Sequence, residues 1–187
     1  MTNPSFQTGL TLKSLRLSRE WSLTRTAKET GVSKAMLGQI ERGESSPTVA
    51  TLWKIATGFN VPFSHFIPVS EPQEPEQVMR SGQAVPRRQR TVAMQATPLF
   101  PYDTALHFDV LAVELIAGAV SESSAHETGV IEHVVVTEGE LQLAVNGKWH
   151  TLKAGEGLRF QADCPHSYLN VSLKTVKFLS LIHYPQQ

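Results

Sequence analysis

The sequence predicts a protein of two domains, an all-α bundle of short helices followed by an all-β sandwich or barrel. Single domains cluster near about 100–150 residues, so a chain of 187 residues suits two small ones. The apolar fraction of 41% can build packed cores, and the charged fraction of 18% is too low for a largely disordered chain. The residue pattern also changes twice, from capped helical segments to a Pro-rich stretch and then to alternating β-formers. We expect domains over residues 1–70 and 91–187, with a linker over 71–90.

The first seventy residues carry start and stop signals for four short helices. Four leucines indicate a first helix that ends near Glu20: Leu10, Leu12, Leu15 and Leu17. The ranges 22–31 and 33–43 each begin with a serine that suits an N-cap and end with a glycine that closes a helix. Pro47 opens a fourth helix, and a short final turn follows over 63–67.

The charge of the chain is unevenly distributed. Residues 1–70 contain eight Lys and Arg but only four Glu, a net charge of +4, although the whole chain has a formal net charge of +0. A basic domain tethered to an acidic one is typical of a phosphate-contacting module joined to a module that does not bind DNA.

The spacing in the second and third helices predicts a helix-turn-helix. Ala27 permits close approach of the two helices, Gly31 permits a tight left-handed turn, and Leu37 and Ile40 anchor the third helix. On a helical wheel, Met36 joins these two aliphatics in a core arc of about 100°. A separate arc of small or polar residues is free to enter a major groove or to serve as an ordinary solvated face: Lys34, Ala35, Gly38, Gln39 and Arg42.

The residue types on this second arc suit the base edges of DNA. Gln39 can pair with adenine, Lys34 can donate to guanine, and Arg42 at the helix end suits a phosphate. Ala35 and Gly38 allow close approach or contact with a thymine methyl group. The candidate DNA-binding residues are Arg25, Ser33, Lys34, Ala35, Gly38, Gln39 and Arg42.

Residues 8–67 resemble the XRE family of phage-repressor-like regulators, through the segment WSLTRTAKETGVSKAMLGQIERGESSPTVATLWKIATGFNVPF. The resemblance implies a lambda-repressor-like bundle in which Arg16 pairs with Glu41 and fixes the first helix against the third. Thr26 departs from the leucine usual in the family, and Leu23 replaces a polar residue that often touches phosphate.

The second half of the chain alternates apolar and polar residues with a period of two. Five strands are indicated: Val110–Leu115, Val134–Val136, Leu141–Val145, Lys148–Leu152 and Val176–Ile182. Asn146-Gly147 between the third and fourth of these strands is a strong hairpin signal. Many short strands at regular spacing indicate a sandwich or barrel.

This half resembles the cupins, double-stranded β-helix barrels that carry two short motifs. Gly155, His166 and Asn170 match the second motif, with Gln161 and Asp163 in place of its usual proline and glycine. In the first motif, Glu132 and Gly139 keep their spacing, but Ala125 and Glu127 stand where two histidines are usual, and His126 is one place off.

The cupin resemblance implies a site built from His126, Glu132 and His166. Two imidazoles and a carboxylate suit Zn or non-haem Fe. His133 is an alternative donor, although strand alternation directs it away from the face of Glu132. The same polar residues could instead line a metal-free effector pocket, or the barrel could serve only dimerisation. Four further side chains are interpreted as structural or incidental: Cys164, His107, His150 and His183.

The fusion of an XRE-like domain to a cupin resembles helix-turn-helix/cupin transcription regulators, and the stretch SKAMLGQIERGESSPTVATLWKIATG resembles regulators of sulfur utilisation. This implies a homodimer, a double-stranded DNA operator and a small-molecule effector, and it leaves repression or activation open. The alternative is a cupin metalloenzyme, a non-haem iron oxygenase or epoxidase that carries a helix-turn-helix domain. A single cysteine and no membrane-length apolar run predict a cytoplasmic protein.

Overall fold

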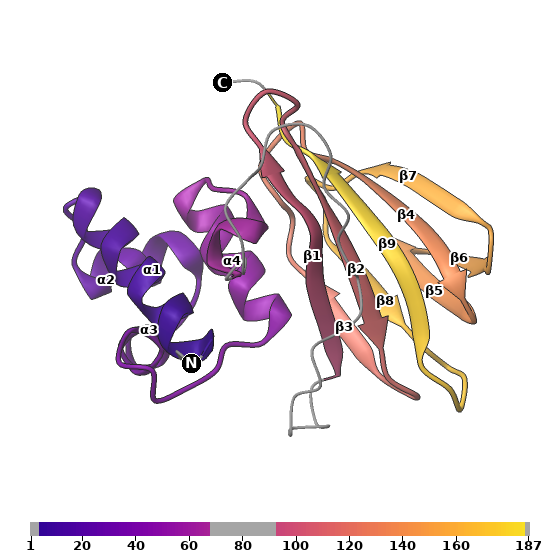
Figure 1. Cartoon of the computed structure of the whole chain (residues 1–187), viewed down its shortest axis with the longest axis horizontal. Coiled ribbons are helices and arrows are strands. Elements are labelled where there is room, and N and C mark those ends of the chain that lie inside the picture. The colour runs from indigo at the N-terminus through magenta and orange to yellow at the C-terminus, as the bar shows by residue number, and fades with distance from the viewer. Residues whose placement is uncertain (1–3, 68–92, 186–187) are drawn as a thin grey trace. The chain divides into compact units, whose positions relative to one another are not determined.

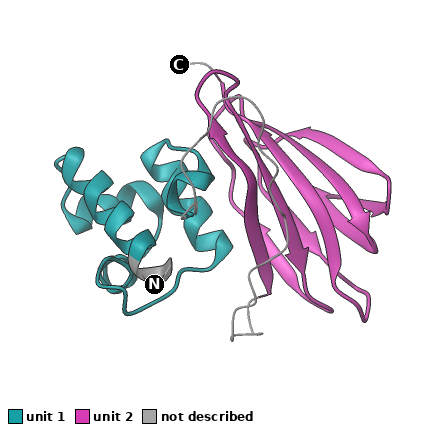
Figure 2. Ribbon diagram, in the orientation of Figure 1, with its two compact units in different colours: residues 1–70 teal, residues 71–187 magenta. Residues whose placement is uncertain are grey.

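The structure, a computed structural model, describes residues 4–67 and 93–185. The chain divides into two compact units, residues 1–70 and residues 71–187, which are described separately below (Figure 2). The first unit is helical and the second is an antiparallel β-structure, as the sequence predicts. The predicted linker over 71–90 lies outside the described residues.

The helical unit contains four α-helices and one 3₁₀ turn (Figure 1): α1 (Pro4–Ser18), α2 (Leu23–Thr30), α3 (Lys34–Glu41), α4 (Val49–Phe59) and η1 (Phe63–Phe66). The side chains of Ser22 and Ser33 accept the N-cap hydrogen bonds of α2 and α3, as predicted. Gly31 closes α2 in the left-handed region, with φ of 66°. The fourth helix was predicted to open at Pro47, but its N-cap is Thr48 and its first residue is Val49.

Two glycines allow the helices to cross at backbone contact. A Cβ atom at Gly9 in α1 would collide with the carbonyl oxygen of Ile40 in α3. A Cβ atom at Gly58 in α4 would lie 2.6 Å from the carbonyl oxygen of Glu29 in α2. The core around these crossings is aromatic and aliphatic, and its most deeply buried side chains are Leu12, Leu37, Ile40, Ile55, Phe59, Phe63 and Phe66. The first crossing therefore fixes α3 against α1, and the second fixes α4 against α2.

The second unit contains nine strands within the described residues (Figure 1): β1 (Met94–Asp103), β2 (Phe108–Leu115), β3 (Val120–Ser123), β4 (Ile131–Glu138), β5 (Glu140–Val145), β6 (Lys148–Lys153), β7 (Gly157–Gln161), β8 (His166–Leu169) and β9 (Val176–His183). They form a five-stranded sheet, in the order β1-β2-β9-β4-β7, and a four-stranded sheet, in the order β3-β8-β5-β6. Every strand pair is antiparallel, and the core lies between the two sheets.

The predicted hairpin is confirmed at Asn146 and Gly147. Both residues have positive φ, 48° and 78°, as a type I′ turn requires, and they join β5 to β6. The five predicted strands correspond to β2, β4, β5, β6 and β9. Pro98 and Pro101 obscured the edge strand β1, whose pairing with β2 shifts register between Pro98 and Phe100.

Candidate DNA-reading helix and candidate metal centre

The candidate DNA-reading helix α3 is fixed to α1 by a two-point ion pair. Arg16 donates from Nε to Glu41 Oε1 at 2.6 Å and from Nη2 to Glu41 Oε2 at 2.9 Å. Its third nitrogen, Nη1, donates to the carbonyl oxygen of Trp21 at 2.9 Å. The hydrogen bond to Glu41 raises the pKa of the Arg16 guanidinium above its usual value. The pairing implied by the family resemblance is therefore confirmed.

The buried face of α3 is rotated from the predicted core arc. Leu37 and Ile40 are buried as expected, but Met36 is 41% exposed and the prediction that it lies in the core is wrong. Gly38, expected on the groove-facing arc, is buried, and a Cβ atom there would lie 3.1 Å from Arg42 Nη1. At about 100° per residue, the buried arc is centred between Leu37 and Glu41, because Glu41 must face Arg16. Including Glu41 in the core arc would have revealed this rotation.

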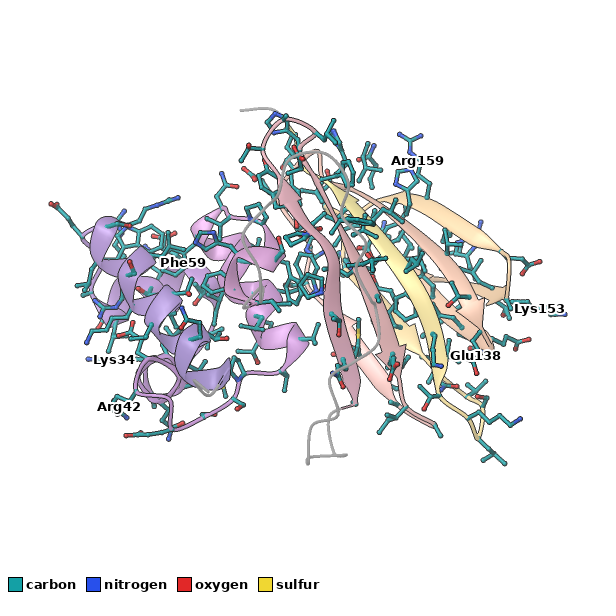
Figure 3. The ribbon with its side chains drawn as sticks, in the orientation of Figure 1. Lys34, Arg42, Phe59, Glu138, Lys153 and Arg159 are labelled. Carbon is teal, nitrogen blue, oxygen red and sulfur yellow. The ribbon has the colours of Figure 1, made fainter. Side chains whose placement is uncertain are left out.

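The other candidate DNA-binding residues are exposed. Figure 3 shows Lys34 and Arg42 projecting outward from the helical unit, whereas Phe59 lies among the helices. The exposed candidates are Arg25, Ser33, Lys34, Ala35, Gln39 and Arg42, and Met36 is exposed beside them. The hydroxyl of Ser33 accepts the backbone N–H of Met36, and Arg25 lies over the ring of Trp21 at 5.2 Å.

Arg42 is oriented by an acidic neighbour. Its Nε and Nη2 atoms donate to the two carboxylate oxygens of Glu44 at 2.7 and 2.8 Å, in an exposed pair. This bidentate arrangement leaves the two N–H groups of Nη1 and one of Nη2 available to an acceptor such as a phosphate.

The second candidate site brings together three buried side chains from separate elements of the β-unit. Glu132 lies on β4, His166 begins β8, and His126 lies in the connection between β3 and β4. Their exposed fractions are 2%, 2% and 8%. The prediction that these three residues converge is therefore consistent with the structure, although the histidines of the first cupin motif are displaced in sequence.

The donor atoms of this cluster are spaced as metal ligands require. Glu132 Oε2 lies 3.8 Å from His126 Nε2 and 3.7 Å from His166 Nε2. Two donor atoms about 2.1 Å from one ion can be at most about 4.2 Å apart, so both separations fit a shared ion. One ligand atom from each of the three residues lies within 4.8 Å of the others, a bound slightly wider than about 4.2 Å, so a shared ion requires the two imidazoles to lie at the near end of that range. The residues present thus fit a two-histidine, one-carboxylate metal centre.

Hydrogen bonds to backbone carbonyls fix the ring of His166 and the backbone of His126. His166 Nδ1 lies 3.0 Å from the carbonyl oxygen of Cys164, which can only accept, so Nδ1 carries the proton and Nε2 presents its lone pair to Glu132. The backbone N–H of His126 donates to the carbonyl of Ala162 at 2.9 Å, and Ala162 donates to Val130 at 2.8 Å. The loop that carries His126 is thereby tied to the segment that leads to His166.

The charges in the cluster favour an ionised carboxylate and neutral imidazole. Burial alone would raise the pKa of Glu132, but the interactions with His126, His166 and Tyr168 outweigh burial and lower that pKa to about 2. Burial lowers the pKa of His166 below its usual value, and the neighbouring carboxylate only partly opposes this effect. A carboxylate beside neutral imidazole is the protonation state in which such residues bind a divalent cation.

Sequence reasoning missed two further residues of this cluster, Tyr168 and Ser180. Tyr168 donates its hydroxyl to Glu132 Oε1 at 2.6 Å, and Ser180 donates to the same oxygen at 2.7 Å. Both are buried, and the period-two pattern of β8 and β9 places each on the inward face with His166 and Phe178. This alternation could have identified them, because a buried hydroxyl on an inward face needs a polar partner.

His133 does not join the cluster. It is half-buried and adjoins Glu132 on β4, where its backbone partners are Arg159 on β7 and Leu181 on β9. Alternation along β4 therefore directs it to the opposite face, as predicted. Among the described residues, the cluster of His126, Glu132 and His166 is the one group of three or more potential ligands.

Comparison with protein families defines the class of protein. The chain matches the Helix-turn-helix family model over residues 12–66 and the Cupin domain family model over residues 111–182. Together with the exposed face of α3, these matches identify a DNA-binding transcription regulator with a sensing cupin domain.

None of the described helices is long and apolar enough to cross a membrane.

Similar proteins then specify the family. The chain is 58% identical to the HTH-type transcriptional regulator SutR of Escherichia coli (strain K12), over 94% of each protein. It is 26% identical to the HTH-type transcriptional regulator PuuR of the same organism, over 96% of each. A crystal structure of an HTH_3 family transcriptional regulator from Vibrio cholerae is 42% identical, covers 97% of both chains and aligns with a TM-score of 0.82. The chain belongs to this family of HTH-type transcriptional regulators.

Proposed function

We propose that the protein is a homodimeric regulator whose barrel binds a divalent metal at His126, Glu132 and His166, and whose effector acts at that centre. The observation that carries this proposal is the convergence of three buried ligands from β4, β8 and the β3–β4 connection in a chain that also reads DNA. Zn and Fe are the candidate ions, because both accept two imidazoles and a carboxylate. The metal would supply a Lewis-acidic centre with coordination positions open to the effector.

The protein's own residues would make this centre selective. His126 and His166 would each hold the ion through one imidazole nitrogen, Glu132 would supply one negative charge, and the side chains of Phe160 and Tyr168 beside His166 would exclude water. The operator contacts would come from exposed residues on and beside α3: Arg25, Ser33, Lys34, Ala35, Gln39 and Arg42. Met36 joins this set because it is also exposed. The relatives' roles as regulators support assignment to regulation rather than to catalysis.

The test begins by mapping the protein's genomic binding sites, which yields an operator fragment and neighbouring genes that suggest effectors. The resemblance to regulators of sulfur utilisation makes small sulfur compounds the first candidates. Operator affinity is then measured by fluorescence anisotropy, with and without effector, for the wild type and His166→Ala. The exposed His183 provides the control variant His183→Ala.

We expect His166→Ala to lose the effector response while retaining operator affinity, because α3 lies in the other unit. His183→Ala should respond as the wild type does. Elemental analysis of untagged protein should find Zn or Fe. Normal effector responses in both His166→Ala and Glu132→Gln would place the sensor elsewhere, and turnover of a small molecule by the loaded protein would favour the metalloenzyme alternative.

A further inference from the structure

The carboxylate of Glu132 is held asymmetrically. Oε1 accepts hydrogen bonds from Tyr168 at 2.6 Å and from Ser180 at 2.7 Å, whereas Oε2 faces Nε2 of both histidines. A carboxylate oxygen has about two lone-pair directions, so two short hydrogen bonds occupy Oε1 fully. Only Oε2 remains available on the side of the two imidazoles.

The two hydroxyl donors are held by strands of different sheets. Ser180 lies on β9, next to β4 in the five-stranded sheet, where its backbone partner is Val134. Tyr168 lies on β8 of the four-stranded sheet, and its ring stacks on Phe178 with centroids 5.4 Å apart and planes 15° apart. The ring of His166 lies edge-on to the ring of Tyr168, with ring centroids 5.7 Å apart. Tyr168 therefore has little freedom to leave Oε1.

We infer that Tyr168 and Ser180 are positioning residues that make Glu132 a one-oxygen ligand and so keep coordination positions open for the effector. This inference rests on the proposed metal centre. With Oε1 occupied, the protein supplies three donor atoms: one carboxylate oxygen and two imidazole nitrogens. One position stays open in a four-coordinate ion and three stay open in a six-coordinate ion, so the effector is a small molecule with its own oxygen, nitrogen or sulfur donor.

The hydroxyls also supply an electrostatic function. A buried carboxylate without hydrogen-bond donors is costly, so the hydrogen bonds to Oε1 preserve the charged form that attracts the cation. Removing either donor leaves one lone-pair direction of Oε1 free, through which this oxygen can turn toward the ion and become a second ligand atom. The predicted signature is a weaker metal affinity together with a change in coordination number, which a purely structural role would not produce.

The experiment compares wild type, Tyr168→Phe and Ser180→Ala as full-length proteins freed of metal. Tyr168→Phe keeps the ring that stacks on Phe178, and Ser180→Ala removes a single oxygen. Tyr102→Phe and Ser167→Ala are matched controls, because both hydroxyls lie outside the cluster. Zn²⁺ affinity is measured by competition with a chromophoric chelator, and the visible spectrum of the Co²⁺-loaded proteins reports coordination number.

We expect Tyr168→Phe and Ser180→Ala each to weaken Zn²⁺ binding by about 10–100-fold, the range typical of residues that orient metal ligands. The Co²⁺ absorption should also lose intensity, because a two-oxygen carboxylate raises the coordination number. Both controls should match the wild type.

The outcomes separate this inference from the proposal on which it rests. A wild type that binds no Zn²⁺ and no Co²⁺ overturns the metal centre and the inference together. A wild type that binds both ions, alongside variants with unchanged affinity and unchanged Co²⁺ spectra, retains the metal centre and overturns the positioning role. If Tyr168→Phe fails to fold, Ser180→Ala decides the question by the same two measurements.

Discussion

The side chain of Arg16, on α1, connects that helix to α3 and to the turn that follows α1. It binds Glu41 of α3 through two nitrogens and the carbonyl of Trp21, in the turn after α1, through the third. The side chains of Arg16 and Glu41 are only 12% and 8% exposed, so solvent screens this pair weakly. Loss of either partner leaves a charge or donor group that water reaches poorly.

Glu41→Gln should therefore lower the free energy of unfolding by roughly 1–3 kcal/mol, because Arg16 loses its charged partner. Urea denaturation of the full chain, followed by helical circular dichroism, measures this change. Glu44→Gln is the matched control, since it breaks an equally short bidentate pair with Arg42 that is exposed, and it should change stability little. Equal effects of the two substitutions would contradict a special role for the Arg16–Glu41 pair.

Lys34→Ala and Gln39→Ala should each weaken binding to the cognate operator by about 1–3 kcal/mol and relax base preference there, through loss of a base-edge contact. Gln7→Ala on α1 and Lys54→Ala on α4 remove the same side chains from exposed positions away from α3. Anisotropy titrations on cognate and random DNA distinguish the effects. An equal loss on both DNAs would show that Lys34 and Gln39 contact phosphates rather than bases.

The site residues could be predicted only where a motif or a charge made them distinctive. His126, Glu132 and His166 are titratable residues near recognisable cupin spacings, and their convergence was expected. Tyr168 and Ser180 match no motif position, and their contact with Glu132 depends on the register of three strands across two sheets. Alternation along β8 and β9 could have placed both hydroxyls on the inward face, but sequence spacing does not determine the register, so their contact with Glu132 became evident only from the folded structure.

At the scale of elements, the crossing of α1 and α3 depends on the absence of a side chain at Gly9. Gly9→Ala should lower the free energy of unfolding by about 1–3 kcal/mol or more. The new Cβ atom would meet the carbonyl oxygen of Ile40, and the backbone there cannot easily move aside. Ser14→Ala, an exposed substitution on the same helix, should be neutral or slightly stabilising. Thermal unfolding of both variants makes the comparison. A Gly9→Ala protein as stable as Ser14→Ala would show that the helices separate without cost.

The sequence predicted elements well where local signals are strong and less well where packing decides. Ser22, Gly31 and Asn146-Gly147 mark caps and a turn through their own backbone preferences, and each acts as predicted. The short strands β3, β7 and β8 were not predicted. The edge strand β1 was missed because prolines normally interrupt strands, but an edge tolerates them. The rotation of α3 was missed because periodicity alone does not show that a charged residue, Glu41, faces inward.

At the scale of the whole molecule, a helix-turn-helix of this size makes few base contacts, so useful affinity needs a second copy. We expect a homodimer that binds two half-sites about 34–36 Å apart, or a multiple of that distance. Sedimentation of the full chain and of residues 91–187 tests both the dimer and the barrel as its interface. A dimeric full chain with a monomeric barrel fragment would assign the interface to the rest of the chain, and a monomeric full chain would contradict the homodimer.

The three ligands are attached to both layers of the barrel, Glu132 to the five-stranded sheet and His166 to the four-stranded sheet. An ion bound by them would link the two layers at that end, so the layers could not part there without losing the ion. Bound metal would therefore act as a crosslink within the barrel, raising its resistance to unfolding by an amount that grows with the concentration of free metal.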